Sequence, residues 1–201
     1  MRPLTEQTVE ELGGEASVLV LQRRDHAELQ RRLARVRAAE GVEQDAALAS
    51  LYRLVFPHAF AEESVIWPAV RQAVPDGEAL TLRNEQEHQQ VNELVERLEG
   101  LRPDDRERAA LVEQVCAVLD QDVRDEEDLI LPRLQDAVDV ATLRRLGRSW
   151  SFVRRTAPTR PHPVVSRRPP GNALAALPLT VLDRSRDLLD AQARRLPLRW
   201  A

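Results

Sequence analysis

The chain contains one helical pattern twice, and this internal duplication constrains its fold more than any other feature. Residues 25–36 open with an acidic residue and a histidine and then place apolar residues three or four positions apart, and residues 87–98 do the same. Residues 58–68 (HAFAEESVIWP) are likewise matched by residues 122–132 (DVRDEEDLILP). Two copies of a two-helix unit predict a pseudo-twofold bundle in which equivalent positions face each other across one centre.

Apolar stripes with helical spacing define four amphipathic segments. Gly41, the turn Pro75-Asp76-Gly77 and Gly100 are expected to end the first three of them. Few glycines and aromatic residues, with abundant Ala, Leu, Glu and Arg, favour helices over strands. The sequence therefore predicts an all-α, up-down-up-down four-helix bundle. We expect the four helices at about residues 15–39, 43–75, 78–99 and 103–137.

The charge and composition change after residue 137. Residues 1–137 carry a net charge of −13, whereas residues 138–201 carry +9. In the second region we expect a short helix over about 140–153, an extended Pro- and Arg-rich strap over 158–170 and a last helix over 172–195. The predicted domains are thus a bundle at 1–137 and a basic C-terminal extension at 138–201, which packs on the acidic bundle.

Several classes of protein are excluded by composition. All 29 basic residues are Arg, so Schiff-base chemistry and a phosphate-binding loop that needs Lys are absent. The single cysteine, Cys116, rules out an internal disulfide framework. No apolar run approaches the roughly 18–20 residues that cross a bilayer, so no membrane association is expected. With an acidic N-terminus unlike a signal peptide, the expected location is cytoplasmic.

Chemistry is concentrated where the two copies of the pattern meet. Three histidines fall on the apolar stripes of three different helices, and carboxylates follow one turn after His58 and after Asp122. Burying three carboxylates in an apolar seam costs several kcal/mol or more unless something neutralises them. Imidazole and carboxylate ligands suit iron, manganese or zinc, and helix bundles hold dimetal sites of this kind. The predicted metal ligands are His26, His58, Glu62, His88, Asp122 and Glu126.

Five nearby residues bear on this prediction. Glu63 and Glu127 lie about 100° around their helices from the predicted ligands and are expected to support them from outside or to face solvent. Tyr52 either flanks the site as a hydrogen-bond donor or is an ordinary boundary tyrosine. Pro57 removes a backbone hydrogen bond and is expected to bend its helix. His162, between two prolines, is expected to be structural or to face solvent.

Over about residues 15–137 the sequence resembles the hemerythrin-like, HHE cation-binding domain family. The resemblance rests on the order His26, His58-x-x-x-Glu62, His88 and a second such pair at Asp122 and Glu126. It implies a four-helix bundle with a non-haem di-iron centre that binds O2, peroxide or nitric oxide. It also implies that His26, His58 and His88 are terminal ligands, and that Glu62 and Glu126 are bridging carboxylates. The departure is Asp122, where the family usually has histidine, so an anion replaces a neutral nitrogen at the second metal.

The function that we expect is a protein with two iron ions that binds and senses or reduces a diatomic or peroxide ligand, in oxidative or nitrosative stress. Manganese or zinc are alternatives to iron, and enzyme turnover stays open. One alternative is reversible O2 binding or iron storage without turnover, and another is a bundle whose basic tail recruits a partner. Nucleic acid is not expected as that partner, because the tail has few aromatic residues and no evident recognition helix. By pseudo-symmetry, His26 and His58 serve one metal, and His88 and Asp122 the other.

Overall fold

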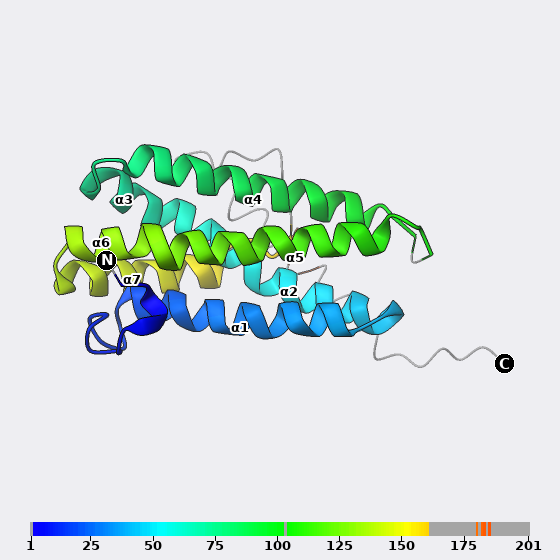
Figure 1. Ribbon diagram of the computed structural model, residues 1–201, viewed down its shortest axis with the longest axis horizontal. Coiled ribbons are helices and arrows are strands. Elements are labelled where there is room, and N and C mark those ends of the chain that lie inside the picture. The colour runs from blue at the N-terminus through cyan, green and yellow to red at the C-terminus, as the bar shows by residue number, and fades with distance from the viewer. Residues whose placement is uncertain (1, 103, 161–179, 181, 184, 186–201) are drawn as a thin grey trace.

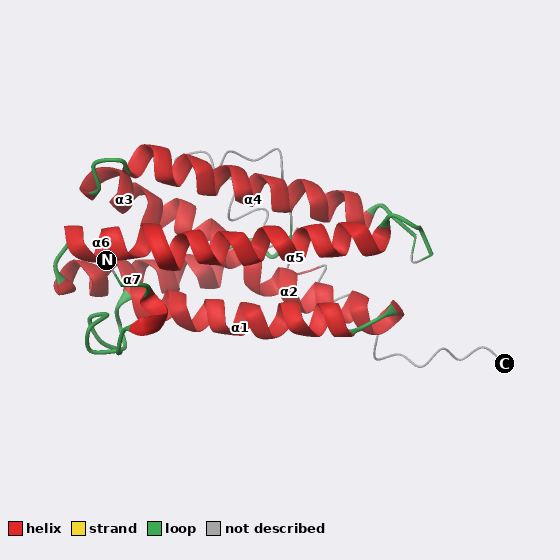
Figure 2. Ribbon diagram, in the orientation of Figure 1, coloured by secondary structure: helices red, strands yellow, loops and turns green. Residues whose placement is uncertain are grey.

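The computed structural model describes residues 2–102, 104–160, 180, 182, 183 and 185. Within this part of the chain every regular element is helical, and the long helices lie side by side and alternate in direction (Figures 1 and 2). The predicted all-α, up-down-up-down bundle is therefore confirmed. Its principal helices are α1 (Val18–Ala38), α2 (Gly41–Ala61), α4 (Gly77–Glu99) and α5 (Arg108–Asp125).

The second and fourth walls of the bundle are each interrupted by a π-helical segment. After α2 come η2 (Glu62–Ile66) and α3 (Trp67–Ala73). After α5 come η3 (Glu126–Ile130) and α6 (Leu131–Ala137). The N–H groups of Trp67 and Leu131 donate to the carbonyl oxygens of the residues five positions earlier, Glu62 and Glu126.

A proline two residues after the end of each π segment explains this geometry. Pro68 and Pro132 have no N–H to donate, and a proline ring clashes with the carbonyl four residues earlier. A wider turn at this point removes the clash, and single π turns of this kind are frequent at functional sites. Because both copies of the sequence pattern contain the proline, both helices widen at the same register. α2 itself continues as an α-helix through Pro57, where the bend stays a prediction.

Gly41 has a different role from the one expected. It does not end the first helix but begins α2, with a φ of +52° that favours glycine. α1 ends at Ala38, so only two residues link the first two helices. At the other end of α1, the Ser17 side chain accepts a hydrogen bond from the Leu19 N–H and caps the helix. The fourth helix begins at Arg108, later than the sequence indicated.

Two apolar clusters fill the bundle, one on each side of a buried polar layer. The first contains residues of α1, α2, α4 and α5, among them Leu33, Leu51 and Val115. The second contains the start of α1, both π segments and the helices after them, with Trp67 and Leu131. Along α1 the first cluster begins at Leu29 and the second ends at Val20, and the buried Gln22 and His26 lie between. The polar layer is thus held between two dry regions.

A further helix, α7 (Val140–Thr156), follows the bundle where the sequence predicted a short fifth helix. It packs mainly against α1, α2 and η2. Gly147 allows a close approach, because a Cβ at this position would overlap the carbonyl oxygen of Ala16. Most of the predicted strap and last helix, with His162, lies outside the described residues. No helix in the described part of the chain is long and apolar enough to cross a membrane.

Candidate metal centre

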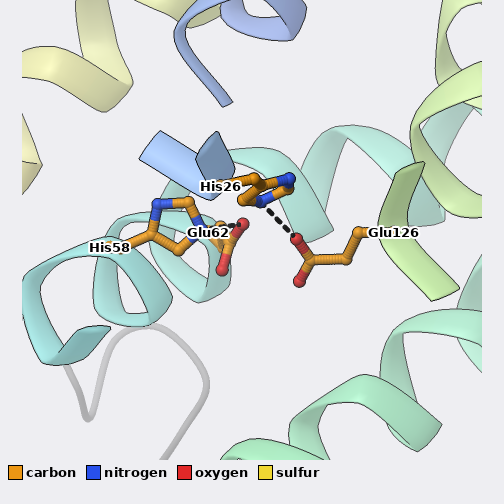
Figure 3. Close-up of side chains that lie close together, drawn as sticks. All are labelled: His26, His58, Glu62 and Glu126. Atoms are coloured by element: carbon orange, nitrogen blue, oxygen red, sulfur yellow. Dashed lines mark ion pairs between the residues drawn. The ribbon is translucent and has the colours of Figure 1, made fainter. Parts of the chain in front are cut away.

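The structure brings the six predicted ligands together in the polar layer. One ligand atom from each member of a first group lies within 4.8 Å of the others, and a second group meets the same criterion. The close-up shows the first group, with the side chains converging from α1, α2, η2 and η3 (Figure 3). The first group is His26, His58, Glu62 and Glu126, and the second is His88, Asp122 and Glu126. Glu126 belongs to both groups, as expected of a shared carboxylate.

In the first group, two imidazoles face two carboxylates. His58 Nε2 lies 3.0 Å from Glu62 Oε1, and His26 Nε2 lies 3.0 Å from Glu126 Oε2 (Figure 3). The two imidazole centroids are 5.1 Å apart. The two rings are therefore close enough to share one ion.

In the second group, the single imidazole faces both carboxylates of that group and also Glu62 of the first group. His88 Nε2 lies 3.5 Å from Asp122 Oδ1, 3.7 Å from Glu62 Oε2 and 3.9 Å from Glu126 Oε1. The side-chain amide of Asn84 donates to Asp122 Oδ1 at 2.7 Å. This hydrogen bond fixes the aspartate, which reaches less far into the centre than a histidine would.

Each histidine is held from outside by a carboxylate on its other ring nitrogen. His26 Nδ1 lies 2.8 Å from Glu127 Oε1, and His88 Nδ1 lies 2.9 Å from Glu63 Oε1. His58 Nδ1 lies 3.2 Å from Asp25 Oδ2. An ionised carboxylate only accepts hydrogen bonds, so each Nδ1 carries a proton and each Nε2 is the nitrogen that points inward. Carboxylate–histidine pairs of this kind orient metal ligands in proteins.

The π segments explain why adjacent glutamates both serve the centre. In an ordinary helix, neighbouring side chains diverge by about 100°. Here Glu62 and Glu63 are both buried, at 0% and 1% exposed, and Glu126 and Glu127 are buried too. The expectation that Glu63 and Glu127 support the histidines agrees with their contacts, and neither faces solvent. The role of Asp25 beside His58 is not among the predictions from the sequence.

The atoms that point into the centre are the ones without protein partners. His26 Nε2, His88 Nε2 and all four carboxylate oxygens of Glu62 and Glu126 are buried and have no partner in good hydrogen-bond geometry within the described chain, and their short contacts are with other predicted ligands. Leaving buried polar atoms unsatisfied costs about 1–3 kcal/mol each, and more for charged groups. Six such atoms facing one small volume are what a cation would satisfy. The residues present therefore fit a metal site.

Without a cation, protons are expected to supply the counter-charge. Burial disfavours the His58 imidazolium, but the Glu62 charge and the hydrogen bonds to Asp25 and Glu62 together outweigh burial and raise the pKa of His58 to about 9. Burial would raise the pKa of Glu62, yet the histidine charges and the hydrogen bond to His58 together lower it to about 2. Burial and then the charge of Glu62 raise the pKa of Glu126 to about 8. Hydrogen bonds to carboxylates likewise outweigh burial and raise the pKa of His26. Because metal ligands must be deprotonated, a cation would displace these protons.

A small cavity lies beside the second group. Its volume is about 10 Å³, room for one water-sized molecule. Its polar lining is His58, His88, Asn92 and Asp122, and the rest of its wall is apolar, including Phe56. The centre is therefore adjacent to a space that admits only a very small molecule.

Tyr52 is placed away from this cavity. Its ring packs on Phe56, with centroids 5.7 Å apart, and it belongs to the boundary of the first apolar cluster. Burial raises its pKa, and the charge of Glu99 adds to the effect. Of its two expected roles, these contacts agree with an ordinary boundary tyrosine. Cys116 is fully buried in the same cluster, as a small apolar residue would be.

A helix bundle with a buried cluster of imidazoles and carboxylates defines the chain as a cation-binding protein in outline. Residues 17–134 match the model of the hemerythrin HHE cation-binding domain. The chain belongs to this family, whose domain binds metal cations. Comparison with curated proteins and with solved structures gives no significant match.

Proposed function

We propose that the protein binds two iron ions in the polar layer and uses them to sense or reduce a small ligand, O2, peroxide or nitric oxide. The observation that carries this proposal is the set of inward, buried and unsatisfied ligand atoms, each imidazole among them held from outside by a carboxylate. A mixed set of nitrogen and oxygen donors suits iron, and manganese or zinc are the alternatives.

The pairing of the two groups supports two ions rather than one. His26 and His58 would hold the first ion, and His88 and Asp122 the second, with Glu62 and Glu126 between them. Iron would supply the redox change and the open coordination position. The chain would orient the imidazoles through Glu127, Asp25 and Glu63, and the apolar walls beside the centre would limit water.

The cavity favours a diatomic or peroxide ligand over a larger substrate. It borders His58 as well as His88 and Asp122, so a bound ligand would lie near both ions. Three imidazoles for two ions leave coordination positions for such a ligand. A role in oxidative or nitrosative stress follows from this ligand class.

Metal analysis of the purified protein, with an optical spectrum, tests the proposal. We expect two iron equivalents and near-ultraviolet charge-transfer bands. Rapid mixing of the reduced protein with O2, peroxide and nitric oxide then separates turnover from reversible binding, because only turnover consumes several equivalents of ligand. A protein that takes up no metal at the polar layer, or that behaves identically after His58→Ala, would contradict the proposal. Arg53→Ala is the matched control, because Arg53 is exposed on the same helix as His58.

A further inference from the structure

The helix that follows the bundle touches the metal centre. Trp150 of α7 is buried, at 3% exposed, and its ring meets that of His58 edge-on, with centroids 5.6 Å apart and planes at 88°. His58 is thereby enclosed between Trp150 and the ring of His26. α7 begins at residue 140 and lies outside the part of the chain that matches the family model, which ends at residue 134.

A second residue of α7 reaches the same histidine through its carboxylate. Arg154 Nε lies 2.5 Å from Asp25 Oδ2, and this oxygen is the one that faces His58 Nδ1 at 3.2 Å. The Arg154 guanidinium also lies 5.4 Å from the centroid of the Trp150 ring, in the range of a cation–π contact. Both side chains of the ion pair are largely shielded, at 30% and 17% exposed for Arg154 and Asp25. The contacts form a continuous series from Arg154 through Asp25 to His58.

We propose that α7 is a working part of the centre, in which Arg154 and Trp150 are positioning residues for His58. The extension would tune the ion at His26 and His58 and leave the ion at His88 and Asp122 unchanged. Partners that orient a metal-bound histidine typically change metal affinity about 10–100-fold when they are lost. The inference rests on the proposed function, because it assumes that His58 binds metal.

The other half of the centre is held by residues outside α7. His88 Nδ1 faces Glu63 of η2, and Asp122 is held by Asn84 of α4. The main contacts of α7 are with α1, α2 and η2 rather than with α4 or α5. Loss of Arg154 is therefore expected to act on one of two ions, which a general loss of stability would not do.

Titration of the full-length, metal-depleted protein with Co²⁺ tests this inference, because the visible spectrum of Co²⁺ reports its ligands. We expect Arg154→Gln to weaken one of two Co²⁺ equivalents by about 10-fold and to shift its visible bands. Arg154→Lys keeps the charge and is expected to recover most of the affinity. Arg148→Gln is the control, because Arg148 is exposed on the same helix. Asp25→Asn removes the intermediate carboxylate and is expected to affect the same equivalent.

The outcomes separate this inference from the proposed function. If Asp25→Asn weakens one equivalent but Arg154→Gln leaves both unchanged, α7 has no positioning role, and the metal site stands. Equal weakening of both equivalents by Arg154→Gln also overturns the inference. Wild-type protein that binds no Co²⁺ would overturn the proposed function and this inference with it. If Arg154→Gln does not fold, Trp150→Phe provides the same test, because it changes the contact on His58 and keeps the ion pair.

Discussion

The α1–α2 side of the centre presents two imidazole nitrogens, whereas the α4–α5 side presents one imidazole and one aspartate. The backbone plan is the same on both sides, including the π segment and the proline that follows it. The difference is the residue at one equivalent position, His58 against Asp122. A hard carboxylate suits manganese and other hard cations better than imidazole does. The comparison shows that the duplicated fold fixes where ligands lie, while single side chains decide which metal they suit.

The outer carboxylates show the same difference. Asp25 precedes His26 and accepts from His58, and Glu87 stands at the matching place before His88. The side chain of Asp122, unlike that of His58, has no N–H to donate to Glu87. One oxygen of Glu87 is buried without a hydrogen-bond partner in the described structure. Burial and then the Asp122 charge raise the pKa of Glu87. Glu87 thus occupies the place of an outer carboxylate for a histidine that this chain lacks.

The largest effect is expected from a change at the carboxylate that both sides of the centre share. Glu126 belongs to both ligand groups, so Glu126→Ala should abolish binding of both ions rather than of one. Metal content by mass spectrometry after dialysis measures the change, and Asp128→Ala, at an exposed position of the same π segment, should retain the wild-type content. Retention of one full equivalent in Glu126→Ala would show that the two sides are independent.

The outer carboxylates should act on opposite sides. Glu127→Gln weakens the hold on His26, and Glu63→Gln weakens the hold on His88, so each should lower the affinity of a different Co²⁺ equivalent by about 10–100-fold. Titration followed by visible spectra distinguishes the two equivalents. Each variant is the control for the other, and identical spectra from both would remove the basis of the comparison.

Asp122→His should make the two sides alike. The new imidazole can bind the second ion and donate to the unpartnered oxygen of Glu87, so we expect tighter Zn²⁺ binding at that side, about 10-fold, and a higher iron reduction potential. The double variant Asp122→His with Glu87→Ala should lose much of the gain. Unchanged stoichiometry and potential in Asp122→His would mean that Asp122 is not a ligand.

The smallest expected effect concerns the docking of α7, which only the first side has. Gly147→Ala forces a methyl group against the Ala16 carbonyl and should cost about 1–3 kcal/mol of stability. For a chain of this size the Tm then falls by about 2–4 °C for each kcal/mol. In Gly100→Ala the new Cβ would lie 3.4 Å from the Arg97 carbonyl oxygen, so this control should melt within a degree or so of wild type. Equal melting of both variants would argue against close docking.

The helix stripes were predictable because burial of apolar residues at helical spacing is a local property of the sequence. The convergence of His26, His58 and His88 followed from those stripes and from the duplication. The π segments were not predictable in this way. A backbone N–H can donate to the carbonyl of the fourth or of the fifth preceding residue, and the choice depends on packing around Pro68 and Pro132. The approach of Arg154 to Asp25 depends on how α7 docks, which no local pattern encodes. The prediction that Gly41 ends the first helix is wrong, because a glycine can either end one helix or begin the next.

The outer carboxylates are exchanged between the two helix pairs, since Glu63 of the first pair holds His88 of the second, and Glu127 of the second holds His26 of the first. Neither pair can therefore orient all its own ligands before it docks on the other. Folding and site assembly end in the same step, so a cation that needs the oriented ligands distinguishes the docked bundle from its separated halves. Such a cation stabilises the docked state according to its concentration relative to its Kd. Metal supply then controls how often the two halves come apart.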